Sequence, residues 1–542
     1  METKIGVFLC NCAGAMKNID LDVAAKKVAK LPDVTSVIVD PSLCLEEGRR
    51  RMLSSIKEGN IERVVIAGCS AEFGGPIFRG VLEKAGLNGH LLSIANIREQ
   101  CSWVHDGDVT AKAVELVKMA VSRVRLLQPM ETKEMAVSKG VLVVGSGFSA
   151  LSTALGLSQL GLRVTALTEE PALKVSSGEL PGLHGFDTDS ITDAVKADKN
   201  IKVLNSARVL GLEGDLGDFR VRIGRVGQDT MHKYGAIVVA TGYRTEFASA
   251  RGPKSGSNVV SQEQFHDMLL TSNLQREPKT IAFMLDFTDE SSRFPTLATL
   301  SNALAAKKKW GSEVYVFYKS VKVDSQGVEK LYQQARDCGV VFCKCETPPR
   351  ISSDDGRVRV EARDVFVGED VVLGCDVVVG EELCLPATGT ETFSSLLNVR
   401  RDAKGFCQDE DVHLYPVGSG RNGIFFVGEC RGELDLGRIM ADVSGVVAQI
   451  NVLLSPGKIT VDFEKVKADP QKCVACLTCV RVCPHGAIHL VRVDSNKEVA
   501  QISDLACDAC GVCAAICPAK AITFKSYRDE EILAQIEAIG RP

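Results

Sequence analysis

The sequence has little of several features that mark large classes of protein. Aromatic residues make up only 5% of the 542 residues, so few rings are available for the bases of a single-stranded nucleic acid to stack on. The 64 Lys and Arg residues are balanced by 69 Asp and Glu residues, and the net charge is -5. A protein that grips a phosphate backbone needs a positive excess, so we expect no nucleic-acid partner.

Targeting and membrane signals are also missing. The first residues contain no basic segment followed by an apolar stretch and a small-residue cleavage site, so a secretory signal peptide is not predicted. The longest apolar stretch, Val141–Leu162, is interrupted by Gly, Ser, Thr and Gln residues. A membrane span of about 20 residues rarely tolerates such a pattern. We therefore expect no membrane span and a cytoplasmic location.

Cysteine, by contrast, is abundant, with 20 residues, eight of them between Cys473 and Cys517. Thiols stay reduced in the cytoplasm, so clustered cysteines there indicate metal or redox chemistry before disulfides. The length predicts three to five folded units. Composition and strand–helix alternation predict an α/β chain with five segments: an N-terminal parallel α/β domain (1–130), a Rossmann-like domain (138–277 and 376–455), an inserted region (278–375), an α+β ferredoxin-type domain (460–525) and a helical tail (526–542).

Residues 1–125 alternate short β-branched stretches with helical ones, which indicates a parallel sheet covered by helices. The predicted strands are Lys4–Leu9, Val34–Val39, Arg63–Ala67 and His90–Ser93. The predicted helices are Asp20–Lys30, Glu46–Glu58, Gly75–Lys84 and Val109–Leu127.

The C-terminal cysteines form two runs with the same spacing, C-x2-C-x2-C-x3-C-P. In bacterial-type ferredoxins the first three cysteines of a run bind one [4Fe–4S] cluster and the fourth binds the other cluster. One cluster is thus predicted on Cys473, Cys476, Cys479 and Cys517, and the second on Cys507, Cys510, Cys513 and Cys483. A zinc site is the alternative, but zinc takes four ligands in two pairs and fits a third cysteine and the Cys-Pro ending poorly.

A strand, a Gly-rich turn and a helix follow one another from Val141. Gly145 would allow the tight turn, Gly147 would let the backbone approach a pyrophosphate, and Ala150 would allow close helix–strand packing. Two later stretches resemble nucleotide contacts of disulfide-reductase-like flavoproteins and favour FAD. The residues concerned are Ala240, Thr241 and Gly242 in the first stretch, and Gly428 and Glu429 in the second.

Several departures from the flavoprotein pattern count against FAD. The acidic residue that should contact the ribose falls at Thr168, with Glu169 one residue later, and the Gly-Gly pair often found shortly afterwards is missing from 170–178. The late acid is Glu429 rather than Asp. The alternative is a Rossmann-like scaffold that has lost its cofactor. The inserted region has no Gly-rich turn after its first strand, Lys279–Asp286, so direct NAD(P)H binding is not supported.

Four N-terminal cysteines follow strands of the first domain: Cys10, Cys12, Cys44 and Cys69. Ligands gather beyond the carboxyl ends of parallel strands, so these thiols are expected on one rim, where a cluster could bind. The alternative is that they are small core residues. Spacing alone does not decide between the two.

Taken together, the segments resemble the flavin-carrying A subunit of heterodisulfide reductase over essentially the whole chain. The most specific matches are the stretches 63–70 (RVVIAGCS), 98–105 (REQCSWVH) and 313–318 (EVYVFY). The resemblance implies a thioredoxin-reductase-like flavin core and a third cluster on the four N-terminal cysteines. It also implies that FAD passes electrons, with bifurcation in some members, among ferredoxin, a thiol-reducing partner and a hydrogenase- or dehydrogenase-linked subunit.

Two departures from this family argue against bifurcation. A further ferredoxin domain inserted in the flavin core is absent, because no C-x2-C-x2-C run follows Gly242. A cysteine triplet after the first strand of the insert is replaced by residues 291–296 (SSRFPT). The remaining cysteines lack ligand spacing and are interpreted as mostly structural; no role is predicted for Cys101.

The main hypothesis is an iron–sulfur flavoprotein electron-transfer subunit without catalytic side chains of its own, since the flavin supplies the reactivity. One alternative is a self-sufficient NAD(P)H:ferredoxin-type oxidoreductase that resembles the small subunit of glutamate synthase. Another is a non-redox assembly platform with a degenerate FAD site. In the tail, Ile532, Leu533, Ile536 and Ile539 share one helical face, which is expected to dock on the chain's own domain; binding of a partner protein is the alternative.

Overall fold

The computed structural model of the chain describes residues 3–539 apart from 174, 176–187, 226, 248–257, 271–275, 288–292, 324–325, 355, 433 and 496. Internal contacts divide the chain into two compact units. Unit 1 comprises Met1–Met135 and Thr460–Pro542, and unit 2 comprises Ala136–Ile459. Strands β5 (Thr132–Ala136) and β24 (Lys458–Asp462), where the chain passes between units, pair with each other.

Unit 1 begins with a four-stranded parallel sheet in the order β2-β1-β3-β4. Its strands are β1 (Ile5–Cys10), β2 (Val34–Asp40), β3 (Arg63–Gly68) and β4 (Leu92–Asn96). Its helices are α1 (Leu21–Val28), α2 (Glu46–Glu58), α3 (Ala71–Lys84) and α4 (Thr110–Leu126), with short turns η1 (Cys12–Gly14) and η2 (Arg98–Ser102). The predicted parallel α/β domain is confirmed.

Alternation along β1 sends successive side chains to opposite faces of this sheet. Val7 and Leu9 pack with α1 and α4, whereas Phe8 packs with α2 and α3. The sequence placed the start of α3 at Gly75, but the helix begins at Ala71 because the Ser70 hydroxyl accepts a hydrogen bond from the Phe73 amide. Each face of the sheet therefore has its own apolar core.

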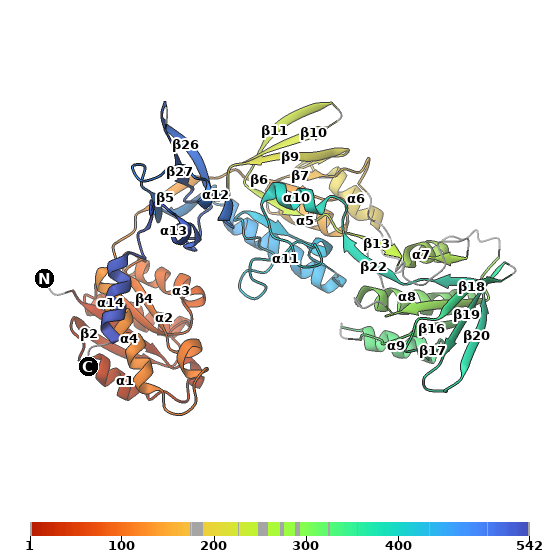
Figure 1. Cartoon of the computed structure of the whole chain (residues 1–542), viewed down its shortest axis with the longest axis horizontal. Coiled ribbons are helices and arrows are strands. Elements are labelled where there is room, and N and C mark those ends of the chain that lie inside the picture. The colour runs from red at the N-terminus through yellow and green to blue at the C-terminus, as the bar shows by residue number, and fades with distance from the viewer. Residues whose placement is uncertain are drawn as a thin grey trace. The chain divides into compact units, whose positions relative to one another are not determined.

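The second part of unit 1 is a small α+β module, as predicted. Its elements are β25 (Val466–Ala468), α12 (Thr478–Val482), β26 (Ile488–Asp494), β27 (Lys497–Ile502), α13 (Val512–Ile516) and β28 (Ile522–Phe524). β25 pairs with β28 and β26 with β27, both antiparallel. Helix α14 (Asp529–Ile539) follows and packs on α4 (Figure 1).

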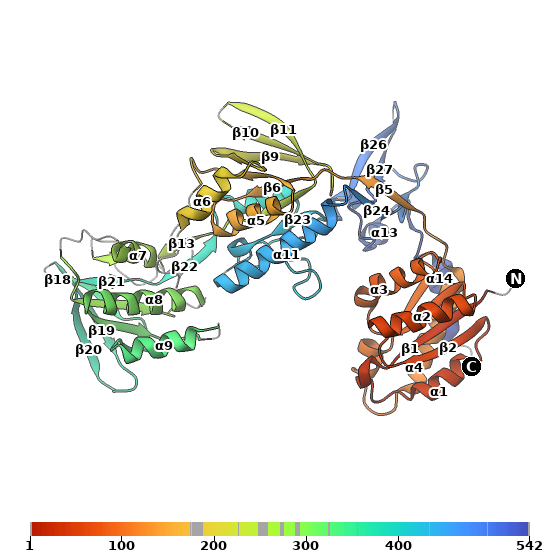
Figure 2. The same ribbon diagram turned by 180° about the vertical axis from the view of Figure 1, so that it is seen from behind.

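Unit 2 contains a parallel sheet in the order β23-β12-β6-β7-β8. Its strands are β6 (Gly140–Val144), β7 (Arg163–Leu167), β8 (Ile201–Leu204), β12 (Ala236–Val239) and β23 (Ile424–Phe426). Helices α5 (Phe148–Gln159) and α11 (Leu436–Leu454) lie on one face, and the antiparallel strands β9 (Ala207–Glu213), β10 (Phe219–Arg225) and β11 (Gln228–Tyr234) lie on the other (Figures 1 and 2). Helix α6 (Thr188–Ala197) packs against α5.

A second parallel sheet in unit 2 has the order β14-β21-β15-β16-β17. Its strands are β14 (Val259–Val260), β15 (Thr280–Leu285), β16 (Glu313–Tyr318), β17 (Val341–Lys344) and β21 (Val377–Val379). The accompanying elements are α7 (Gln262–Leu270), α8 (Arg293–Trp310), α9 (Val328–Asp337), β18 (Arg350–Asp354), β19 (Arg357–Arg363) and β20 (Asp370–Cys375). Antiparallel strands β13 (Tyr243–Phe247) and β22 (Glu382–Pro386) pair with each other, and α10 (Thr390–Leu397) follows β22.

These two sheets confirm the predicted two-nucleotide-fold core, with a different boundary for the insert. The sequence placed residues 258–277 and 376–380 in the first nucleotide fold. Instead, β14 pairs with β21, and β21 pairs with β15 in the second sheet. Phe265 and Leu269 of α7 are buried in the core of that second sheet. Pairing between segments more than 100 residues apart leaves no local sign in the sequence.

Helix α11 is the one helix in the described part of the chain whose length and composition would let it cross a membrane. Core helices of globular proteins pass the same test. The buried residues Ile439, Val446 and Ile450 of α11 pack with α5 and the first parallel sheet of unit 2. Packing in that core accounts for the apolar composition of this side of the helix.

Candidate functional site

The turn between β6 and α5 forms the floor of a cavity in unit 2. Gly145 has φ +143°, and a Cβ there would lie 1.9 Å from the Ala240 carbonyl oxygen, so only glycine fits. Gly147 is the N-cap of α5 and forms no side-chain cap, which leaves backbone N–H groups of the first turn open to a ligand. Ala150 is buried beneath this turn, where its small side chain allows the close approach that the sequence predicted.

The cavity has a volume of about 630 Å³ and is lined by eight of the ten predicted cofactor residues. The eight are Gly145, Gly147, Thr168, Glu169, Ala240, Thr241, Gly242 and Glu429. The other two, Ala150 and Gly428, are buried and do not line the cavity. The buried Thr168 hydroxyl accepts a hydrogen bond from the Glu170 amide, and both Glu169 and Glu170 line the cavity. The missing Gly-Gly pair falls partly on residues 174 and 176–178, outside the described residues.

The turn η4 (Gly428–Arg431) carries the acidic residue Glu429 into this cavity. Gly428 has φ +71°, and a Cβ there would lie 2.6 Å from the Ser149 Cβ. The Ser149 hydroxyl donates a hydrogen bond of 3.4 Å to the buried Glu429 carboxylate. Glu429 is thus held against the first turn of α5, although the sequence has Glu where the pattern expects Asp.

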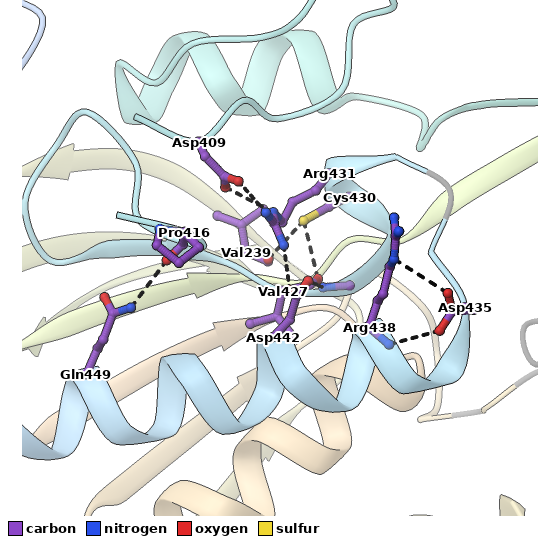
Figure 3. Close-up of polar contacts among 11 residues, drawn as sticks. Val239, Asp409, Pro416, Val427, Cys430, Arg431, Asp435, Arg438, Asp442 and Gln449 are labelled. Carbon is purple, nitrogen blue, oxygen red and sulfur yellow. Dashed lines mark hydrogen bonds and ion pairs between the residues drawn. The ribbon is translucent and has the colours of Figure 1, made fainter. Parts of the chain in front are cut away.

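A buried ion-pair network holds η4 in place (Figure 3). Arg431 pairs with Asp409 through Nε at 2.9 Å and with Asp442 through Nη1 at 2.5 Å. Asp442 also accepts a hydrogen bond of 3.1 Å from the Gly428 amide. Burial raises the pKa of Asp442, while the ion pair with Arg431 opposes that rise. The Asp409 and Asp442 carboxylates therefore both stabilise the turn that carries Glu429.

The second nucleotide fold supplies a wall of the cavity that the sequence did not predict. Gln262 and His266 of α7 and Asn302 of α8 line it and hydrogen-bond to one another: the Asn302 amide donates to Gln262 at 2.9 Å, and His266 Nδ1 lies 3.3 Å from Asn302 Oδ1. The backbone N–H of Gln262 donates to the buried Glu382 carboxylate, and burial raises the pKa of Glu382. The Ser301 hydroxyl also lines the cavity and is buried without a hydrogen-bond partner among the described residues.

A different part of the cavity lining, at 387–389, did have a signal in the sequence. The tripeptide Ala-Thr-Gly occurs after β12 at 240–242 and again after β22 at 387–389. Both copies line the cavity, and each lies at the end of the β13–β22 pair. The repetition was visible without a structure, but its meaning depends on that strand pairing.

In the C-terminal module, the two cysteine runs adopt matching backbone conformations. Ala475 and Ala509 have φ values of +52° and +54°, and the next matching pair, Leu477 and Gly511, has +64° and +87°. Left-handed Ala and Leu are unfavourable unless the surroundings require them. The backbone of both runs is therefore curled in the same way.

Backbone amides in this module point at the predicted ligand sulfurs. Cys483 accepts a hydrogen bond from the Ala487 amide at 3.4 Å, and Cys517 accepts the equivalent bond from the Ala521 amide at 3.3 Å. The Ala500 amide donates to Cys473 and the Ala509 amide to Cys507, both at 3.4 Å. Amide donors of this kind stabilise thiolates that carry a cluster.

The four thiols predicted to share the second cluster are neighbours. Cys483, Cys507, Cys510 and Cys513 line one small cavity. Burial, together with the charges of Cys507, Cys483 and Cys510, raises the pKa of Cys513 to about 12. Cys483 of the first run thus lies beside the first three cysteines of the second run, and the ligand exchange inferred from spacing remains a prediction.

Three of the four N-terminal cysteines lie at the switch point of their sheet, which is the place beside β1 where the helical connections pass to opposite faces of the sheet. Cys10 ends β1, Cys12 follows it, and Cys69 follows β3. The Cys10 and Cys12 sulfurs are 3.7 Å apart, and the hydrogen bond from Cys12 lowers the pKa of Cys10 to about 6. Burial raises the pKa of Cys69, which the positive charge of Arg98 opposes. Cys44 packs on the same apolar cluster as Cys10 and Cys12.

Other cysteines have structural surroundings. Cys101 is fully buried in the core between α1, α4 and the sheet. The Cys430 thiol donates to the Val239 and Val427 carbonyls at 3.2 and 3.4 Å, and burial raises its pKa well above the usual range (Figure 3). Burial also raises the pKa of Cys375 to about 12.

No group of three or more Cys, His, Asp or Glu side chains in the described part of the chain is close enough to share a single ion. A [4Fe–4S] cluster binds each thiolate through a different iron atom, so its ligands stand farther apart than those of one ion.

Comparison with known proteins adds three findings. Residues 472–521 match the family model of the 4Fe-4S dicluster domain. The whole chain is 28% identical to the first iron–sulfur A subunit of the CoB–CoM heterodisulfide reductase of Methanopyrus kandleri, covering 99% of this chain and 98% of that protein. It is 26% identical to the A subunit of the H(2):CoB-CoM heterodisulfide,ferredoxin reductase of Methanothermobacter thermautotrophicus, covering 99% and 97%.

Solved structures are more distant. Lactococcus lactis thioredoxin reductase matches 58% of this chain and 99% of its own, with 16% identity and a TM-score of 0.43, too low to carry an argument by itself. The alignment with the Methanopyrus protein spans 668 positions, more than the 542 residues of this chain, so the relative contains segments without a counterpart here. The replaced cysteine triplet falls partly on 291–292, outside the described residues. Along nearly its whole length, the chain is similar to the A subunits of heterodisulfide reductases, and the resemblance predicted from the sequence is confirmed.

Proposed function

We propose that the chain is an iron–sulfur flavoprotein subunit of a heterodisulfide-reductase-like oxidoreductase, located in the cytoplasm. It would hold FAD in the cavity of unit 2, two [4Fe–4S] clusters in the C-terminal module and a third on Cys10, Cys12, Cys44 and Cys69. The observation that carries the proposal is the convergence of eight predicted cofactor residues on one cavity. Bound FAD exchanges electrons in pairs or singly, which lets it connect two-electron donors to clusters.

The residues around the cavity fit a dinucleotide. The open N-terminus of α5 offers amides to a pyrophosphate, and Gly145 keeps the backbone close enough to reach it. Glu169 and Glu170, at the end of β7, would accept hydrogen bonds from ribose hydroxyls. Ser149 orients Glu429 toward the same space. On the opposite wall, the buried Ser301 hydroxyl offers a polar group that has no hydrogen-bond partner among the described residues.

The partner subunits follow from the names of the relatives. The Methanothermobacter thermautotrophicus protein is named as the A subunit of an enzyme that acts on hydrogen, a heterodisulfide and ferredoxin. We infer that this chain likewise passes electrons between thiol-reductase-like and hydrogenase- or dehydrogenase-linked subunits, and to ferredoxin. None of its described side chains needs to make or break a substrate bond for that role.

The first experiment is anaerobic purification with flavin and iron quantification of the wild type and of Gly145→Ala and Gly428→Ala. Each variant places a methyl group in space already occupied by Ala240 or Ser149, so flavin content should fall at least about tenfold while the C-terminal iron remains. Gly445→Ala on α11, where a Cβ meets nothing closer than 3.9 Å, is the matched control.

Full iron without flavin in the wild type would instead support the assembly platform. Bleaching of the bound flavin by NADH or NADPH, in the isolated chain under anaerobic conditions, would support the self-sufficient oxidoreductase.

A further inference from the structure

Helix α14 packs against α4 with its polar face, which is the reverse of the expected orientation. Glu531 is fully buried between the two helices. Its carboxylate accepts a hydrogen bond of 3.0 Å from Arg528 and lies 3.9 Å from the Arg123 guanidinium of α4. Arg528 also donates to the Leu126 carbonyl at the end of α4. A buried charge cluster, rather than apolar packing, therefore joins the helices.

A second set of contacts fixes the entry to α14. The Arg123 guanidinium donates to the Ser526 carbonyl at 2.8 Å and lies 4.5 Å from the centre of the Tyr527 ring. Arg123 thus holds both the segment that precedes the helix and the carboxylate inside it. Rotating α14 to bury its other face would leave the Glu531 charge without these partners, which is costly in a protein interior.

The apolar face of α14 points to solvent as a result. Ile532, Leu533, Ile536 and Ile539 are 44%, 55%, 58% and 54% exposed. The expectation that this stripe docks on its own domain is therefore wrong, although the helix itself does. Their i, i+1, i+4 and i+7 spacing forms one continuous stripe, the pattern of a helix that lies in an apolar groove of another protein.

The charges beside the stripe indicate what kind of surface covers it. Glu530 and Glu537 lie one above the other along one edge of the stripe, seven residues apart, and both are exposed; Glu530 also lies 3.8 Å from the Arg528 guanidinium in a surface ion pair. Residues 529–539 contain no Lys or Arg. A second copy of α14 laid antiparallel on the first would bring this acidic edge against its own equivalent, which is unfavourable. Basic groups on the covering surface would complement it.

We propose that α14 is the docking helix for a neighbouring redox subunit, which receives the Ile-Leu stripe in an apolar groove bordered by Lys or Arg. This inference rests on the proposed function, because it requires partner subunits. It assigns one of them to a defined surface of unit 1, on the helix that directly follows the iron–sulfur module.

The test uses the tagged full-length chain expressed in its native host and purified anaerobically with its partners. A photo-crosslinking residue at Leu533 should join α14 to one stoichiometric iron–sulfur or thiol-reductase subunit, at a peptide that contains Lys or Arg. The dissociation constant for that purified subunit should rise at least about tenfold in Ile532→Ser/Ile536→Ser. Glu530→Lys/Glu537→Lys, which keeps good helix formers at exposed positions, should weaken binding further at low salt than at high salt.

The matched control is Leu160→Ser/Leu270→Ser, which removes apolar side chains of 46% and 53% exposure elsewhere on the chain and should leave binding unchanged. Iron and flavin content verify that every variant is folded. Cross-links to a second copy or within the same chain, or unchanged affinity of both α14 variants, would overturn the inference and leave the proposed function intact. Purification of the wild type without any redox subunit would overturn both.

Discussion

The two cysteine-bearing regions of unit 1 differ in the share of their apolar core that thiols supply. In the C-terminal module, Cys479, Cys507 and Cys513 belong to the buried cluster, whose large apolar members are Val466, Ile488, Ile522 and Phe524. In the N-terminal domain, two larger cores of aliphatic and Phe side chains lie on the two faces of the sheet, and Cys10 is one thiol among the eleven buried members of the second core.

The comparison predicts that the C-terminal module needs its clusters in order to fold, whereas the N-terminal domain folds without a cluster. A small module with few apolar groups gains stability from its metals, whereas a sheet with two cores does not need them. One thiol of each region shows a large pKa shift of opposite sign: burial is the main cause that raises the pKa of Cys513 to about 12, and the Cys12 hydrogen bond lowers that of Cys10 to about 6. Four predictions follow this contrast.

The largest effect is expected from iron removal. Cys513→Ser, or chelation of iron under anaerobic conditions, should unfold the C-terminal module because it removes the centre of its core. Amides of β26 and β27 should exchange at least about 100-fold faster by hydrogen–deuterium exchange mass spectrometry, while those of β1 and β3 keep their protection. Protected β26 and β27 amides in the iron-free chain would contradict the comparison.

The second prediction concerns Cys69. Cys69→Ser should remove one cluster's share of iron and its EPR signal, yet change the free energy of unfolding of the N-terminal domain by no more than about 1 kcal/mol. Cys101→Ala is the control with the opposite pattern, because Cys101 is fully buried in an apolar core and is no predicted ligand. That variant should keep its iron and lose stability. Equal iron loss in both variants would show that the rim and the core are not separable.

The third prediction is a pH dependence of the iron-free N-terminal rim. Thiolate absorbance at 240 nm, taken as the difference between wild type and Cys10→Ser, should rise through a midpoint near pH 6. Because this folded pKa lies below that of an unfolded thiol, ionised Cys10 stabilises the fold at high pH, and this contribution disappears as the pH falls through 6. Cys12→Ala should move the midpoint upward, and an unchanged midpoint would contradict the assignment of the hydrogen bond.

The smallest effect is expected from a helix cap far from the thiols. The Asp20 carboxylate accepts a hydrogen bond of 2.9 Å from the Val23 amide at the start of α1. Asp20→Ala should cost about 1 kcal/mol of unfolding free energy, measured by denaturant titration, and leave iron content unchanged. Loss of iron in this variant would mean that the rim depends on global stability after all.

Different parts of the molecule were predictable to different degrees. The spacing of the two C-terminal runs predicts their ligands, and eight of the ten predicted cofactor residues line one cavity because Gly-rich turns after buried strands have few other uses. The wall formed by Gln262, His266 and Asn302 was missed because it comes from α7 and α8, whose residues follow ordinary helical patterns. The boundary of the insert was missed because β14 pairs with β21 across a long stretch of chain.

By itself, the sequence determined the order of the folded segments, the parallel sheets, the dicluster motif within 472–521 and the glycines of the cavity, since these depend on local spacing. Only the tertiary structure decided which thiols become neighbours at the rim, which polar groups close the cavity and which face of α14 is buried. The last case states the physical reason most clearly. Burial of the apolar stripe of α14 would be favourable in proportion to the apolar area removed from water. The buried pairing of Glu531 with Arg528 and Arg123, however, forms only when α14 packs on α4, and it turns the stripe outward.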